Sequence, residues 1–216
     1  MRVVPHGPYY HGPPQGDKIT LRKRYGVPLD KQVALFFGDI RPDKNLDLFL
    51  QAMVPYKDRL FLVVAGQAKG RDGTGISEYI ARAENLGLSG NILWRCEYIP
   101  DNEVPNFFEL CDWVAMPYSS RFTSQSGVLN VAMAHRRPVL VSTTPTIAET
   151  LKNFPVGVVV SPDSLEELRR AIVTFLNTDQ SCFKGSIESY LKMYSWEKNA
   201  STTALVYGEF QRACVE

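Results

Sequence analysis

The chain of 216 residues is long enough for one large domain, or for one domain with a C-terminal extension. Its 24 Lys and Arg residues against 23 Asp and Glu residues give a net charge of +1, so it lacks the positive field that draws a nucleic-acid backbone, and we expect no nucleic-acid partner. No stretch approaches ~18 consecutive apolar residues and no basic-then-apolar leader is present, so we expect neither a transmembrane helix nor a signal peptide.

The four cysteines have no paired spacing and lie mostly in apolar contexts, which favours buried thiols in a reducing compartment. They are Cys96, Cys111, Cys182 and Cys214. We therefore expect a cytoplasmic protein. Peripheral association of a full-length protein with a membrane stays open.

The first residues, Val3–Tyr10, form an extended segment with turn residues, which is typical of a linker in mid-protein rather than of a natural N-terminus. His6 stands there between a proline and a glycine, and we interpret it as a turn residue rather than a catalytic base. A short basic helix is predicted at Ile19–Tyr25, with Arg22, Lys23 and Arg24 on its solvent side.

From Val33 onward, short continuous apolar runs alternate with segments whose apolar residues recur at helical spacing. The predicted strands are Val33–Phe37, Leu60–Ala65, Ile92–Trp94, Trp113–Met116, Val139–Ser142 and Val158–Val160. The predicted helices cover Leu46–Met53, Ile76–Ala83, Val104–Cys111, Val128–Met133 and Leu165–Phe175, with a short one near Glu149. Asn102, Thr146 and Ser164 are the predicted caps of three of them, the last two by capping-box spacing.

This alternation predicts an α/β fold, a Rossmann-like doubly wound parallel sheet of about six strands, because parallel strands need crossover helices. We divide the chain into a linker segment at 1–30, the Rossmann-like domain at 31–180 and C-terminal helices at 181–216. Ligands of such sheets bind beyond the carboxyl ends of the strands. Four loops meet there: Gly38–Lys44, Gly66–Gly75, Arg95–Ile99 and Tyr118–Ser126.

The stretch Tyr118–Val141 carries the strongest local sign of a ligand. Ser124, Ser126 and Gly127 stand where a helix begins, and the first turn of a helix offers unpaired N–H groups to an anion. A phosphate fits this pattern, although Ser-Gly before a helix more often marks a simple N-cap with a tight turn.

Arg41 and Lys44 follow the first strand, where two cations can reach a diphosphate held at that helix start. Cations at a helix N-terminus oppose the helix dipole, which favours a functional role for them. The glycine-rich loop Gly66–Gly75 lacks the G-x-G-x-x-G order, and we interpret it as a flexible loop. No Asp-x-Asp or histidine cluster is present, so we expect no metal and no cofactor.

The C-terminal segment predicts a long helix with one apolar stripe. The stripe residues alternate spacings of four and three: Trp196, Ala200, Thr203, Tyr207, Phe210 and Cys214. Such a stripe needs a surface to pack on, and a homodimer through this helix is one way to provide it.

Together these segments resemble the carboxyl-terminal, nucleotide-sugar-binding half of retaining GT-B glycosyltransferases of the glycogen synthase and mannosyltransferase kind, glycosyl transferases group 1. The resemblance covers nearly the whole chain. It rests on Gly38–Asn45, Val63–Gly66, Asn91–Glu103, Asp112–Tyr118 and Ala132–Val139.

The resemblance implies a role for Lys44 at the donor diphosphate and for the backbone near Tyr98 and Ile99 at the base. The family's arginine beside the first glycine is replaced by Asp39, with Arg41 two residues on. We therefore predict Lys44 and Arg41 as catalytic cations. The predicted substrate-binding residues are Tyr98, Ile99, Thr123, Ser124, Ser126, Gly127, Val128 and Asn130.

Two glutamates of the family are absent, since their positions hold Thr123 and Val131. In the family the second usually binds the ribose hydroxyls, and the neighbouring Asn130 is the candidate substitute. Arg136 stands where a helix-ending glycine is usual.

The resemblance implies the donor-binding half of a glycosyltransferase that takes sugar from a nucleoside diphosphate sugar with retention, a hexosyltransferase. Its partner is a missing N-terminal half that binds the acceptor, and this fragment alone is expected to be inactive. Two alternatives stay open: a non-catalytic nucleotide- or protein-binding module, and half of a GT-B nucleotide-sugar epimerase.

Overall fold

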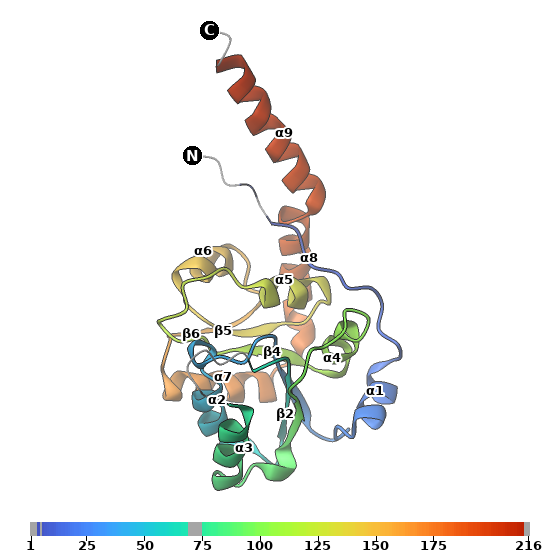
Figure 1. Cartoon of the computed structure of the whole chain (residues 1–216), viewed down its shortest axis with the longest axis vertical. Helices are drawn as coiled ribbons and strands as arrows, with labels where there is room; N and C mark the ends of the chain where they lie inside the picture. The colour runs from blue at the N-terminus through green and yellow to red at the C-terminus, as the bar shows by residue number, and fades with distance from the viewer. Residues whose placement is uncertain (1–3, 5, 69–74, 214–216) are drawn as a thin grey trace.

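The computed structural model describes residues 4, 6–68 and 75–213, and its centre is one parallel sheet of six strands in the order β3-β2-β1-β4-β5-β6 (Figure 1). The strands are β1 Gln32–Phe37, β2 Leu60–Ala65, β3 Ile92–Arg95, β4 Trp113–Met116, β5 Val139–Ser142 and β6 Gly157–Val160. This order, which reverses between β1 and β4, is that of a dinucleotide-type doubly wound sheet, so the predicted Rossmann-like fold is confirmed.

Helices cover both faces of the sheet. The helices are α1 Lys18–Tyr25, α2 Leu46–Met53, α3 Ile76–Asn85, α4 Val104–Leu110, α5 Gly127–Ala134, α6 Pro145–Asn153, α7 Leu165–Asn177, α8 Lys184–Met193 and α9 Trp196–Ala213. Short 3-10 turns are η1 Pro42–Lys44, η2 Val54–Tyr56, η3 Ser89–Asn91 and η4 Gln180–Phe183.

Two apolar cores follow from the alternation of side chains along the strands. Val33 and Leu35 of β1 face one core, which α1, α4, α5, α6 and α8 cover. Ala34 and Phe36 face the other, which α2, α3 and α7 cover. The strands are apolar on both faces because helices bury both.

Several local predictions are wrong in detail. α6 begins with Thr144 as its N-cap rather than Thr146, and α4 begins after Glu103, without the predicted side-chain cap from Asn102. Ser164 does cap α7 by accepting the Glu167 N–H, as predicted. The Glu167 carboxylate, however, accepts from the Ser161 N–H and hydroxyl instead of closing the capping box.

Two predictions about exposure also need correction. Of the described cysteines, Cys111 is buried and Cys96 half-buried, but Cys182 is exposed on η4. Arg22 is buried, because its guanidinium donates to Asp112 at 2.7 Å and to the Leu110 carbonyl at 2.8 Å. Cys214 and most of the glycine-rich loop lie outside the described residues.

Asp112, just before β4, ties α1 to the sheet. Its carboxylate accepts from Lys18 at 2.8 Å, from Arg22 at 2.7 Å and from the Val33 N–H at 2.7 Å. Burial raises the pKa of this carboxyl, but the hydrogen bond and charge of Lys18, with Arg22 and the Val33 N–H, outweigh burial and hold the pKa below its usual value.

The described N-terminal segment meets the start of α9, and α9 extends away from the sheet (Figure 1). α8 belongs to the core, since Ile187 and Tyr190 are buried in it, whereas α9 exposes 69% of Tyr207. The indole of Trp196 at the start of α9 donates to the Pro8 carbonyl at 3.0 Å and packs on His6. Within the described residues, no helix combines the length and apolarity needed to cross a membrane.

Candidate functional site

A cavity of about 430 Å³ opens where β1 ends and α5 begins, at the sheet edge predicted to bind ligand. Residues from the N-terminal segment, the β1–α2 connection and α5 line it. They are Tyr9, His11, Phe37, Gly38, Asp39, Arg41, Lys44, Gly127, Val128 and Val131.

Gly38 forms the floor of the cavity. It has φ +89°, a conformation that side chains other than glycine rarely adopt. A β-carbon on Gly38 would lie 3.2 Å from the Lys44 Nζ and 3.3 Å from a Val128 methyl group. The absent side chain therefore lets the ammonium and the first turn of α5 approach the same point.

Lys44 is the most deeply buried cation of the site, with 6% of its surface exposed. Its Nζ lies 3.5 Å from the Phe37 carbonyl oxygen, at the limit of a hydrogen bond, and 5.9 Å from the centre of the Tyr118 ring. Burial first, and then the charge of Arg41, lowers its pKa to about 8, while Asp39 and Asp43 act in the opposite direction. Because it is buried, this ammonium has lost much of its hydration, and a bound anion would replace the lost interactions.

Arg41 lies at the mouth of the same cavity, immediately before η1. One terminal nitrogen pairs with Asp43 at 3.2 Å, and its buried Nε has no hydrogen-bond partner among the described residues. A buried donor without an acceptor is costly in a folded protein, and an incoming anion is one way to satisfy it.

The start of α5 is held by two hydroxyl groups. Ser126 is the N-cap, as predicted, and its Oγ accepts the Leu129 N–H at 3.4 Å. The hydroxyl of the buried Tyr118 lies 3.0 Å from the same oxygen, which fixes the cap. Burial raises the pKa of Tyr118 to about 12, so this hydroxyl stays protonated at neutral pH.

Four of the predicted site residues meet in the cavity: Arg41, Lys44, Gly127 and Val128. Ser126 is not among the lining residues, but it caps the helix that begins with Gly127 and Val128. The other predicted residues do not line the cavity. Tyr98 is 63% exposed, and Ile99 is buried in an apolar core. Thr123 and Ser124 are exposed on the loop before α5, and Asn130 accepts a hydrogen bond from Tyr190 at 2.9 Å.

Val131 lines the cavity and is 6% exposed. The family pattern that this chain resembles has a glutamate at this position, whereas here an apolar side chain lines the cavity. The neighbouring Asn130 side chain is engaged with α8.

The N-terminal segment supplies two lining residues that the sequence did not indicate, Tyr9 and His11. The Tyr9 hydroxyl is 2.9 Å from the His6 Nε2, and its ring lies 3.7 Å from where a β-carbon on Gly127 would be. No local pattern marks these residues, because the contact joins distant parts of the chain. His6 does not line the cavity, and its Nδ1 lies 2.8 Å from the Gly7 carbonyl oxygen.

The arrangement is suited to binding an anion electrostatically. Two cations face the N-terminal end of α5, whose amide dipoles also favour negative charge. Among the described residues, no three His, Cys, Asp or Glu side chains gather as a metal site would require.

Comparison with known proteins gives a consistent result. A family model described as "Glycosyl transferases group 1" matches residues 17–190. The D-inositol 3-phosphate glycosyltransferase of Mycolicibacterium paratuberculosis is 27% identical over 212 residues, which is 93% of this chain and 45% of that protein. The chain thus spans about half the length of this relative.

Solved structures share the fold. Sucrose-phosphate synthase from Thermosynechococcus elongatus superposes with a TM-score of 0.78 at 18% identity, over 98% of this chain and 53% of that one. Anabaena HepE in complex with UDP-glucose superposes with a TM-score of 0.77 at 18% identity, over 89% of this chain and 52% of that one. The resemblance expected from the sequence motifs is confirmed.

Proposed function

The chain belongs to the family of glycosyl transferases group 1, and from this premise we propose that it is the donor-binding half of a glycosyltransferase. It takes a sugar from a nucleoside diphosphate sugar and transfers it with retention of configuration. The observation that carries the proposal is the cavity in which Lys44 and Arg41 face the first turn of α5.

The chemistry required of this half is electrostatic. When the bond between sugar and diphosphate breaks, negative charge grows on the departing diphosphate. Lys44, Arg41 and the start of α5 are placed to stabilise that charge, and preorganised groups in a desolvated site do so without reorganising. No side chain of this cavity needs to act as a nucleophile.

The complex of HepE with UDP-glucose supports a nucleoside diphosphate sugar as the donor. Recognition of the ribose by a carboxylate on α5 is not part of the proposal, because Val131 occupies that position. We assign recognition of the ribose instead to Tyr9 and His11 of the N-terminal segment, which line the cavity beside α5.

The acceptor would bind to a second, N-terminal half. This chain covers 45% of the mycobacterial relative, and the apolar side chains of α9 offer a surface on which another half can pack. A cytoplasmic location is consistent with the free thiols Cys96, Cys111 and Cys182.

A non-catalytic nucleotide-binding module is the second candidate, and the apolar side chain of Val131 is the observation that favours it. Both candidates require the diphosphate site, so two experiments are needed. Binding tests the site, and product analysis separates a transferase from a non-catalytic module.

Calorimetric titration of uridine and guanosine diphosphates into the chain tests the site. We expect Lys44→Ala to weaken binding by about 1.5 to 3 kcal/mol, the range for a hydrogen bond to a charged group. Lys23→Ala, which removes an exposed cation of α1, is the control and should bind as the wild type does. Equal affinities of the wild type and Lys44→Ala for both diphosphates would contradict the proposal of a diphosphate site at Lys44.

Analysis of the products formed by this half together with its N-terminal half tests catalysis. Transfer of sugar with the anomeric configuration unchanged supports the transferase. Diphosphate binding without any turnover of donor supports the non-catalytic module, and an altered donor sugar without transfer would indicate an epimerase.

A further inference from the structure

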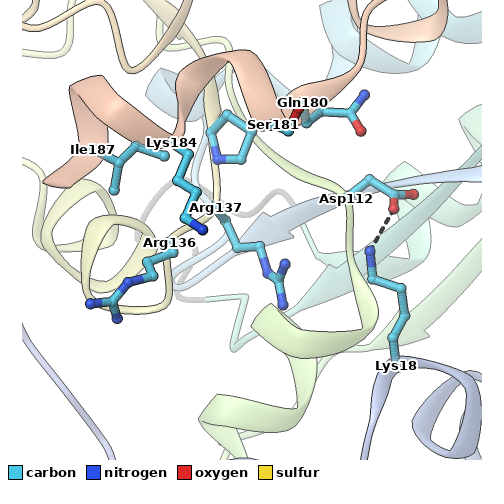
Figure 2. A pocket seen from close by; sticks show the side chains of 9 residues that line it. Lys18, Asp112, Arg136, Arg137, Gln180, Ser181, Lys184 and Ile187 are labelled. Carbon is cyan, nitrogen blue, oxygen red and sulfur yellow. Dashed lines mark hydrogen bonds and ion pairs between the residues drawn. The ribbon is translucent and has the colours of Figure 1, made fainter.

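A second cavity, of about 260 Å³, lies at the opposite edge of the sheet, beside the amino ends of β4 and β5 (Figure 2). Asp112 and Pro138, which immediately precede those two strands, belong to its lining. The remaining lining residues come from α1, the α5–β5 turn, η4 and α8: Lys18, Arg136, Arg137, Gln180, Ser181, Lys184 and Ile187.

Positive charge dominates this cavity. Figure 2 shows Lys184 reaching down from α8 toward the turn that carries Arg136 and Arg137, with Lys18 approaching from α1 on the other side. Lys18 is held by Asp112 at 2.8 Å, Arg136 by Glu188 at 2.6 Å, and Arg137 by Glu109. The ammonium of Lys184 forms no ion pair or hydrogen bond with the described residues.

The charges do not balance. The four lining cations and Arg22, which shares Asp112, face four carboxylates, so one positive charge is left over; the carboxylates are Asp112, Glu188, Glu109 and Asp179, the last of which accepts hydrogen bonds from the lining Ser181. Arg137 is only 18% exposed and uses its Nε and one terminal nitrogen in hydrogen bonds to α4, which leaves the other terminal nitrogen for a ligand. The remaining positive charge and this free Arg137 nitrogen favour an anionic ligand such as a phosphate monoester, which carries about −1.5 to −2 at neutral pH.

Arg136 is held in a strained conformation at this site. It has φ +55°, in the left-handed region, and follows the C-cap His135 of α5. Its N–H donates to the Met133 carbonyl at 2.9 Å and the Arg137 N–H to the Ala132 carbonyl at 2.9 Å, which is a Schellman turn. Glycine is the usual residue there, and the exposed pair with Glu188 contributes less than the left-handed conformation costs.

We propose that this cavity binds a phosphate monoester, with Lys184, Arg137 and Arg136 contacting its oxygens. Tetrahedral phosphate accepts several charge-assisted hydrogen bonds at once, which suits cations arriving from different elements. Ile187 and Pro138 form an apolar wall for a small organic group on the phosphate. The volume is below that of typical drug-sized ligand sites of roughly 300 to 1,000 Å³, which favours a ligand smaller than a nucleotide.

Such a phosphate can belong to a soluble ester or to a lipid headgroup, and two experiments separate these sources. All variants carry Lys44→Ala, so that phosphate does not bind at the carboxyl edge of the sheet. The first experiment titrates glycerol 3-phosphate calorimetrically at low salt and about pH 7.5, above the second phosphate pKa of about 6. The second measures co-sedimentation with phosphatidylcholine vesicles containing or lacking phosphatidic acid.

We expect Lys184→Gln to weaken binding about tenfold, the loss of one charge-assisted hydrogen bond. Arg136→Gly should weaken it similarly, yet its melting temperature should not fall, because glycine relieves the left-handed strain. Lys192→Gln, in the last turn of the same helix and outside the cavity, is the matched control and should change nothing.

Binding to the soluble ester alone identifies a soluble ligand, and binding to the vesicles alone identifies a lipid headgroup. Either result supports the proposed site if Lys184→Gln weakens the binding that is observed. The proposal is overturned if neither probe binds at millimolar concentration, or if Lys184→Gln and Arg136→Gly bind as the Lys44→Ala parent does. Uridine diphosphate binding to Lys184→Gln with native Lys44 should be unchanged, so failure here leaves the donor site intact.

Discussion

Gly66 packs directly on Gly38: a β-carbon on Gly66 would lie 2.2 Å from the Gly38 carbonyl oxygen. These residues follow β2 and β1, and both have positive φ, +136° and +89°. The two strand ends can approach this closely because Gly66 has no side chain. Gly38 in turn contacts Lys44 and Val128, so the packing of two glycines sets the floor of the candidate donor site.

Gly66→Ala should therefore damage both stability and the site. The methyl group must displace the backbone of Gly38, and the left-handed conformation adds strain, so we expect the free energy of unfolding to fall by about 2 to 4 kcal/mol. Urea denaturation measures this change. Gly90→Ala is the control, since a β-carbon there contacts nothing within 4 Å, and it should change stability little. Equal losses in both variants would contradict this explanation.

Asp112→Asn should lower the stability of the fold and should also change how that stability depends on pH. The substitution leaves Arg22 buried without its carboxylate, which costs about 3 to 5 kcal/mol for a buried pair. Because the folded state holds the pKa of Asp112 below its unfolded value, the carboxylate stabilises the protein above that unfolded value and its contribution is lost as the pH falls.

Acid titration of the unfolding free energy checks this second effect. The wild type should lose more stability than Asp112→Asn between neutral and acid pH. Asp30→Asn, at an exposed position, should follow the wild-type curve. Parallel curves for the wild type and Asp112→Asn would show that the carboxylate does not carry the acid dependence.

The sheet was predictable from the sequence because its signals are local. A parallel strand buried on both faces is a continuous apolar run, as in Leu60–Ala65, where every residue is buried. The cap Ser126 was also predictable, since it lies beside the helix that it starts. The pairing of Lys44 with α5 followed from the rule that ligands bind beyond the carboxyl ends of strands.

Features set by distant contacts were not predictable. Arg22 has the local pattern of a solvated basic helix, but its partner Asp112 is 90 positions away. Asn130 is bonded to Tyr190 across 60 positions, and Tyr9 reaches the cavity from the far end of the chain. A single sequence contains no sign of such pairs, because they depend on how the helices pack.

Lys44→Met should stabilise the protein while weakening diphosphate binding. Burial lowers the pKa of Lys44 from 10.5 to about 8, so the folded state disfavours the charge. Methionine fills similar volume without that cost, and the gain in unfolding free energy at neutral pH should reach up to roughly 3 kcal/mol. A substitution that weakens binding and also destabilises the fold would indicate a structural lysine.

The pH dependence fixes the cause of that gain. Below about pH 8 Lys44 is charged in both the folded and the unfolded state, and the full cost of burying the charge applies. Between about pH 8 and 10.5 Lys44 keeps its proton only in the unfolded state, so the stability of the wild type rises with pH. The advantage of Lys44→Met should thus be largest near neutral pH and vanish above about pH 10.5. Urea denaturation of both proteins at several pH values measures it.

The exposed stripe of α9 should cause self-association of the isolated chain. Trp196 and Tyr207 lie on one face of the helix and are 48% and 69% exposed. Burying such side chains stabilises a contact by about 1.5 to 3 kcal/mol each, so we expect concentration-dependent dimers in sedimentation equilibrium. Tyr207→Lys should shift the chain to monomer, whereas Lys198→Gln should not. A wild-type monomer at all concentrations would contradict this.

Tyr9 should contribute directly to nucleotide binding through its ring. The ring lines the cavity within van der Waals distance of a β-carbon position on Gly127, and its hydroxyl bonds only to His6 among the contacts described for it. Burying such a ring against the ribose side of the nucleotide contributes roughly 1.5 to 3 kcal/mol. We therefore expect Tyr9→Ala to weaken uridine diphosphate binding by about that amount in calorimetry, while Tyr9→Phe, which keeps the ring and loses the bond to His6, retains affinity. Tighter binding by Tyr9→Ala would mean instead that the ring covers the start of α5 and must leave before a diphosphate can enter.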